Sequence, residues 1–91
     1  MNKTIISMSK ITIYTKTGCP HCHKAMDMMN TLKLDFEEIN VDNIEDQQEL
    51  VERTNVMSVP QIFIGKEFLG GYDELIELKS SGKLDQLLKD N

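Results

Sequence analysis

Both cysteines and both histidines of this 91-residue chain lie in one short stretch, Cys19-Pro20-His21-Cys22-His23. Thiols and imidazoles this close together suit three kinds of chemistry: metal binding, a structural disulfide, or thiol–disulfide exchange. A structural zinc site usually takes its four ligands from two separated segments, so that the metal ties the chain together. No other Cys or His is present in the sequence, and one helical turn cannot arrange four ligands as a tetrahedron. We therefore expect no metal site.

A purely structural disulfide between Cys19 and Cys22 is also a poor explanation. It would close a very short loop, which contributes little stability in the chain-entropy picture. It would also be reduced in the cytoplasm, where we expect this protein because its first residues have no apolar run typical of a signal peptide. Redox catalysis remains, since a C-x-x-C pair between a strand and a helix of a βαβ pattern is typical of thiol–disulfide oxidoreductases.

The place of Cys19 just before a helix predicts different roles for the two thiols. Unpaired backbone N–H groups and the helix dipole favour negative charge at a helix start, and Lys16 and Lys24 add positive charge nearby. Such surroundings lower the pKa of a thiol from about 8.5 towards ~3.5–7.5, and the thiolate is the attacking species. We expect Cys19 to be the exposed nucleophile and Cys22, one turn later, to be the resolving thiol.

Hydrophobic patterning predicts the elements that must position this pair. In chain order they are strand 11–15, helix 22–32, strand 36–41, helix 44–54, a hairpin of strands 61–65 and 67–70, helix 73–80 and a short helix over 84–88. The second helix is predicted to begin with a capping box, Asp42-x-x-Glu45, and to bury Ile44 and Leu50 on one face. This order predicts an α/β fold whose first two strands are parallel.

Charge and length narrow the possible partners. The net charge is −5, and residues 35–52 carry eight acids and no base, so we expect no nucleic-acid partner because the chain would repel phosphates. No run approaches the ~18 apolar residues of a membrane span, so we expect no membrane partner. We expect a single domain over residues 1–91, with residues 1–9 as an N-terminal extension of which the first seven are dispensable.

Three motifs together resemble the glutaredoxin family: YTKTGCPHC (14–22), SVPQIFI (58–64) and GGYDEL (70–75). They follow the family's order and spacing, cover about residues 11–89, and are most similar to the bacterial glutaredoxin 3-like dithiol type. The resemblance implies a thioredoxin-like fold, with a four-stranded mixed sheet flanked by helices. It also implies a monomer that uses glutathione as co-substrate and needs no cofactor.

The resemblance further implies a glutathione site. Pro60 is cis in the family, and Val59 presents its backbone N–H and C=O to the cysteinyl part of glutathione, like an added strand. Asp73, which taken alone is equally suited to be a helix N-cap, would hold the α-ammonium of glutathione together with Tyr72. His21 stands where the family commonly has Tyr, and there it would pack against glutathione.

The glycine carboxylate of glutathione needs a partner of its own. Lys16 is the residue that we expect to meet it, with Gln61 and Arg53 as further candidates.

The expected activity is reduction of protein disulfides and protein–glutathione mixed disulfides through the Cys19–Cys22 dithiol. Two alternatives stay open. One is a dedicated hydrogen donor for a single enzyme such as ribonucleotide reductase. The other is a glutaredoxin-like iron–sulfur cluster carrier, although such relatives resemble CGFS or lack the proline that this chain has at Pro20.

Overall fold

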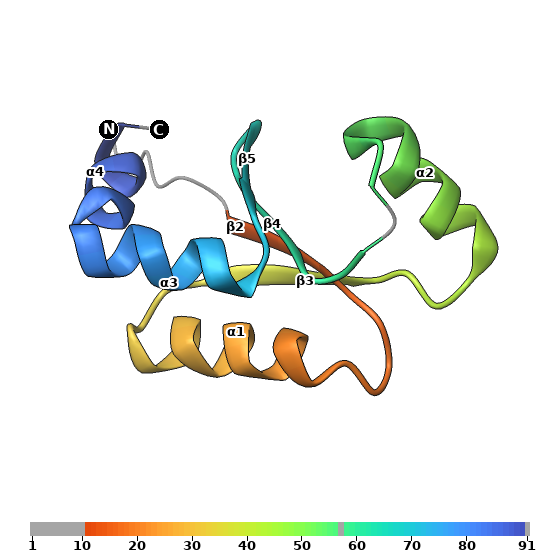
Figure 1. Ribbon diagram of the computed structural model, residues 1–91, viewed down its shortest axis with the longest axis horizontal. Helices are drawn as coiled ribbons and strands as arrows, with labels where there is room; N and C mark the ends of the chain where they lie inside the picture. The colour runs from red at the N-terminus through yellow and green to blue at the C-terminus, as the bar shows by residue number, and fades with distance from the viewer. Residues whose placement is uncertain (1–10, 57, 91) are drawn as a thin grey trace, which may run out of the picture.

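The computed structural model describes residues 11–56 and 58–90, in which a four-stranded mixed sheet is flanked by helices (Figure 1). The elements in chain order are β2 (Ile11–Thr15), α1 (Pro20–Thr31), β3 (Phe36–Asn40), α2 (Ile44–Thr54), β4 (Gln61–Ile64), β5 (Glu67–Gly70), α3 (Tyr72–Ser81) and α4 (Lys83–Asp90). This arrangement confirms the expected thioredoxin-like fold. The predicted N-terminal extension lies outside the described residues.

The strand order β3-β2-β4-β5 brings distant segments of the chain together. β2 pairs in parallel with β3, as predicted, and antiparallel with β4, with Tyr14 opposite Gln61. The C-terminal end of β2 therefore lies beside the start of β4. The cysteine loop follows that end of β2, and Val59-Pro60 precedes β4, so the sheet itself places two of the sequence motifs side by side.

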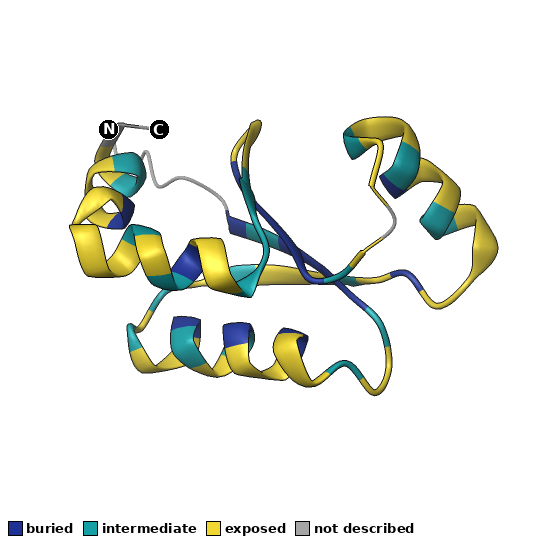
Figure 2. Ribbon diagram, in the orientation of Figure 1, coloured by how far each residue is buried: buried dark blue, intermediate teal, exposed yellow. Residues whose placement is uncertain are grey.

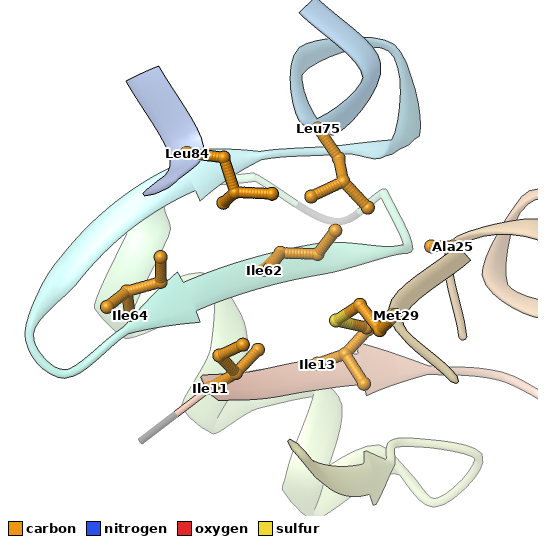
Figure 3. Close-up of a cluster of buried hydrophobic side chains, with 8 residues drawn as sticks. All are labelled: Ile11, Ile13, Ala25, Met29, Ile62, Ile64, Leu75 and Leu84. Carbon is orange, nitrogen blue, oxygen red and sulfur yellow. The ribbon is translucent and has the colours of Figure 1, made fainter. Parts of the chain in front are cut away.

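Alternating side chains of β2 and β4 give the sheet two cores. Ile13 and Ile62 are fully buried on one face, where they pack with residues of α1, α3 and α4 (Figure 3). Tyr14 and Phe63 are buried on the other face, against α2, with their rings edge to face and centroids 5.7 Å apart. Figure 2 shows the buried residues concentrated along the inner strands and on the side of α1 that faces the sheet.

Helix α2 departs from the sequence-based prediction at its start. Its N-cap is Asn43, whose side-chain oxygen accepts a hydrogen bond from the N–H of Asp46 at 2.9 Å. The predicted capping box, Asp42-x-x-Glu45, is therefore wrong by one residue. The cause is that the carboxylate of Asp42 is bound elsewhere, to Thr17 in the loop before the cysteines.

The buried face of α2 is also narrower than predicted. Leu50 is 1% exposed, whereas Ile44 is 63% exposed. At 3.6 residues per turn, positions six apart point roughly 120° away from each other, so the two side chains cannot share one narrow contact face. Leu50 is thus the buried side chain of a helix that Figure 1 shows well apart from the other three.

None of the helices in the described residues is long and apolar enough to cross a membrane.

Candidate active site

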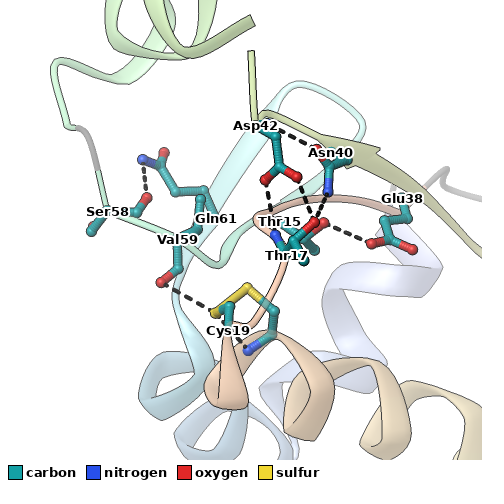
Figure 4. The surroundings of a disulfide bond; sticks show 10 residues. Thr15, Thr17, Cys19, Glu38, Asn40, Asp42, Ser58, Val59 and Gln61 are labelled. Atoms are coloured by element: carbon teal, nitrogen blue, oxygen red, sulfur yellow. Dashed lines mark hydrogen bonds between the residues drawn. A yellow bond between two sulfur atoms is a disulfide. The ribbon is translucent and has the colours of Figure 1, made fainter. Parts of the chain in front are cut away.

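Cys19 and Cys22 are joined by a disulfide, with their Cα atoms 5.3 Å apart (Figure 4). Pro20 is the first residue of α1, and Cys19 is its N-cap, with the N–H of Cys22 donating to its Sγ at 3.1 Å. Cys19 is half-buried and Cys22 is 1% exposed. When the pair is reduced, the same N–H and the helix start are available to a thiolate on Cys19.

The second motif meets the cysteines at the start of β4. The Val59–Pro60 peptide bond is cis, as the resemblance implies. The carbonyl oxygen of Val59 lies 4.0 Å from Sγ of Cys19, although the two residues are 40 positions apart. The main chain just before β4 therefore lies directly beside the reactive sulfur.

Gln61 fixes the segment that precedes Pro60. Its side chain is 2% exposed, and its Nε2 donates to the carbonyl oxygens of Val56 at 3.0 Å and Ser58 at 2.8 Å. The amide nitrogen thus holds the loop, although Gln61 also lines the groove described below.

Arg53 is engaged in a similar way on α2. Its guanidinium donates to the hydroxyl of Tyr14 at 2.6 Å and lies 4.1 Å from the ring centroid of Phe63. This cation–π contact covers the edge of the smaller core, so Arg53 stabilises the packing of α2.

A groove of about 490 Å³ is lined by His21 and by Val59, whose carbonyl oxygen lies beside the Cys19 sulfur, but not by the cysteines themselves. Five of the residues predicted to bind glutathione line it: His21, Val59, Pro60, Tyr72 and Asp73. The ring centroids of His21 and Tyr72 are 5.9 Å apart, so the starts of α1 and α3 meet across it. Lys16 is not among the lining residues.

The start of α3 forms one end of the groove. Its N-cap is Gly71, whose N–H donates to Oε1 of Glu74 at 2.7 Å. Gly70 has a φ of 114°, and a Cβ there would lie 2.7 Å from Cγ of Glu74, so the close approach requires glycine. Asp73 is therefore not the N-cap; it is exposed in the first turn and lines the groove.

Comparison with known proteins agrees with this geometry. The profile of the family described as Glutaredoxin matches residues 11–69, more than half of the chain. The chain belongs to the glutaredoxin family. It is 40% identical to Glutaredoxin 3 of Escherichia coli K12 over 83 residues, which cover 90% of this chain and all of that protein. The predicted bacterial glutaredoxin 3-like type is thereby confirmed.

Solved glutaredoxin structures share its fold. The solution structure of glutaredoxin from Brucella melitensis is 42% identical, with a TM-score of 0.79 and 91% of each chain covered. The crystal structure of a buckwheat glutaredoxin–glutathione complex is 28% identical, with a TM-score of 0.78, covering 88% of this chain and 76% of that one. With its C-x-x-C pair, this glutaredoxin is a thiol–disulfide oxidoreductase, the enzyme class expected from the sequence.

The structure of this glutaredoxin adds a contact that the motifs did not reveal. The carboxylate of Asp42 accepts hydrogen bonds from the N–H of Thr17, at 2.9 Å, and from its hydroxyl. These bonds, with the positive charge of Lys16 as a smaller cause, hold the pKa of Asp42 below its ordinary value of 3.8. The signal that could have predicted this contact is the topology: polar residues follow the ends of two adjacent parallel strands, 11–15 and 36–40, which meet at one edge of the sheet.

Proposed function

We propose that this glutaredoxin uses glutathione to reduce protein disulfides and protein–glutathione mixed disulfides. The observation that carries the proposal is the position of Cys19: a helix-start sulfur lies 4.0 Å from the backbone of Val59, at the rim of a groove large enough for a small peptide. A thiolate at that place would attack the sulfur of a ligand bound along the main chain of Val59.

The groove supports a binding mode for the tripeptide. The N–H and C=O of Val59 would pair with its cysteinyl unit as an added strand does, next to the buried Pro60. Tyr72 and Asp73 would hold its α-ammonium end, because Asp73 is exposed and carries the required negative charge. His21, opposite Tyr72, would pack against the ligand. The glutathione complex of the buckwheat relative supports this choice of ligand.

Lys16 would serve the other end of the ligand. It is half-buried on the loop that leads to Cys19, outside the lined part of the groove. Its flexible four-carbon side chain ends in a point charge that would meet the glycine carboxylate where the tripeptide leaves the groove.

In the monothiol route, the Cys19 thiolate attacks the glutathione sulfur of a protein–glutathione mixed disulfide. The old S–S bond breaks, and the substrate's sulfur leaves as a thiolate that takes a proton from water. A second glutathione thiolate then attacks the glutathione sulfur bound to Cys19. This releases glutathione disulfide and restores the Cys19 thiolate. One half of that disulfide comes from the substrate, so each turnover oxidises one free glutathione and reduces the substrate sulfur to a thiol.

In the dithiol route, Cys19 attacks a sulfur of a protein disulfide and forms a mixed disulfide with the substrate. The thiolate of Cys22 attacks Cys19, which frees the reduced substrate and produces the Cys19–Cys22 disulfide. Two glutathiones then reduce that bond. Since the site recognises only the sulfur and the tripeptide, we expect many weakly held protein substrates, ribonucleotide reductase being one candidate. We also expect the protein to act as a monomer, in the cytoplasm and without a cofactor.

The test compares two reducing systems on one substrate. A glutathionylated peptide is incubated with this protein and either glutathione, glutathione reductase and NADPH, or thioredoxin reductase and NADPH. We expect rapid NADPH oxidation with the first system and only background with the second. Turnover supported by thioredoxin reductase, with none supported by glutathione, would overturn the proposal.

A further inference from the structure

Asp42 fastens the loop that carries the reactive cysteine (Figure 4). One carboxylate oxygen accepts the N–H of Thr17 at 2.9 Å, and the other accepts its hydroxyl. Asn40 joins the same cluster: its Nδ2 donates to the hydroxyl oxygen of Thr17 at 3.4 Å, and its Oδ1 accepts the N–H of Asp42 at 2.8 Å. Asn40, at the end of β3, and Asp42 thus hold the loop through both the main chain and the side chain of Thr17.

The rest of the loop has little else to hold it. Only Lys16, Thr17 and Gly18 separate β2 from Cys19. Gly18 is exposed with a φ of 77°, and nothing lies within 4 Å of the place where its Cβ would be. Thr17 is therefore the point at which this turn is attached to the sheet, two residues before the N-cap sulfur.

We infer that Asp42 is a positioning residue for Cys19: through Thr17 it keeps the Cys19 sulfur at the start of α1, within reach of the Cys22 N–H. That N–H···S contact is 3.1 Å in the structure. If the loop moves away, the thiolate loses both this hydrogen bond and the field of the helix start. The consequence for turnover rests on the proposed function, whereas the effect on the thiol does not.

The position of the loop and the charge of Asp42 have opposite effects on the pKa of Cys19, so variants can separate the two contributions. The negative charge of Asp42 disfavours a nearby thiolate, so its removal alone lowers the pKa of Cys19. Loss of the anchoring hydrogen bonds raises that pKa. The neighbouring basic groups Lys16, His21 and Lys24 are unchanged in every variant below, so the comparison isolates these two contributions.

Four variants separate them, each in a Cys22→Ser background that leaves Cys19 as the single thiol. Asp42→Asn removes the charge but keeps an oxygen for the Thr17 N–H and an NH₂ group for its hydroxyl oxygen. Asp42→Ala removes both charge and hydrogen bonds. Thr17→Val keeps the charge and loses the hydroxyl, which Thr17→Ser restores. Asp35→Ala, which removes an exposed acid elsewhere, is the matched charge control.

The measurement is the rate of Cys19 alkylation by iodoacetamide as a function of pH, with melting temperatures in parallel. We expect the pKa of Cys19 to be about 0.5 higher in Asp42→Ala than in Asp42→Asn, and alkylation below that pKa to be about two- to fivefold slower. The pKa of Cys19 should likewise be higher in Thr17→Val than in Thr17→Ser. This second pair tests the inference if Asp42→Ala does not fold. Asp35→Ala should match the background protein.

Equal pKa values within both pairs would overturn the inference, including the case in which only the melting temperatures differ. No glutathione is present in this experiment. A wild-type protein that fails in the glutathione assay would therefore refute the proposed function without deciding whether Asp42 positions Cys19.

Discussion

At the scale of single residues, the sulfur of Cys19 has two structural roles: it forms the disulfide with Cys22, and it caps α1. Sγ of Cys19 caps a helix by accepting an N–H, a place where Ser, Thr, Asp or Asn usually stands. The sequence predicted a helix just after Cys19 and the difference in exposure between the cysteines, because Pro20 and the C-x-x-C spacing are local signals. The apolar pattern alone placed the helix start at residue 22, two residues after its observed start at Pro20. It did not predict the Thr17–Asp42 contact, because that contact depends on which strands become neighbours.

His21 is the residue between the cysteines that we expect to set the reduction potential. In the reduced protein its imidazole can donate a hydrogen bond to the Cys19 thiolate; in the disulfide form described here that sulfur carries no charge, and the ring lies against Tyr72. Stabilising the reduced form makes the protein more oxidising than the ~−200 to −230 mV of glutaredoxins.

Replacing His21 with Tyr should therefore make the potential more negative, by about 10–30 mV for one hydrogen bond. The potential is measured at neutral pH against glutathione buffers. Equal potentials in the two proteins would refute this role and leave His21 as a residue that only contacts the ligand.

Asp42 makes a pH-dependent contribution to stability. Its pKa in the folded protein is lowered by the Thr17 hydrogen bonds, so the charged form is favoured in the folded state. The contribution is fully present above the unfolded value of 3.8 and is lost as the pH falls through the lowered folded value.

Asp42→Asn should thus be less stable than wild type at pH 7, and the difference should shrink in strong acid. Urea unfolding at neutral and acidic pH measures it, with Asp35→Asn as the control for loss of a surface charge. A stability difference that stays constant over this pH range would contradict the assignment.

At the scale of elements, apolar patterning predicted the order of strands and helices, the hairpin that became β4 and β5, and the parallel pairing of the first two strands. It was less accurate for α2, where Ile44 and Leu50 both fit a helical pattern but only Leu50 is buried. The reason is physical: a helix that touches the sheet along a narrow strip buries only the side chains within that strip, and a sequence pattern does not give the width of the contact.

Leu50→Ala should consequently destabilise the protein by about 2–5 kcal/mol, the usual cost of emptying a buried leucine site. Ile44→Ala, a change of similar size on the same helix, should cost less than about 0.5 kcal/mol because that side chain is mostly exposed. Chemical denaturation of both variants tests this, and comparable losses would show that α2 packs by a wider face.

At the scale of the whole molecule, the site exists only because three segments converge. A long stretch of sequence separates the start of α1 from the turn before β4, and the β4–β5 hairpin separates that turn from the start of α3. The sheet order makes the three segments neighbours. The three motifs named most of the groove in advance, including His21, Val59 and Tyr72. They did not indicate that the side chain of Gln61 holds the loop before Pro60, since a motif does not reveal the hydrogen-bond partners of its residues. Arg53, which binds Tyr14, lies outside all three motifs.

The central claim is that Cys19 alone can exchange with glutathione, whereas Cys22 is needed only to resolve protein disulfides. It is tested by measuring glutathione-dependent turnover of a glutathionylated peptide by Cys19→Ser and Cys22→Ser. We predict that Cys19→Ser falls to the uncatalysed background, because nothing replaces the activated thiolate. Cys22→Ser should keep turning over this substrate while it loses reduction of a protein disulfide. Complete loss of turnover in Cys22→Ser, or substantial turnover by Cys19→Ser, would contradict the account.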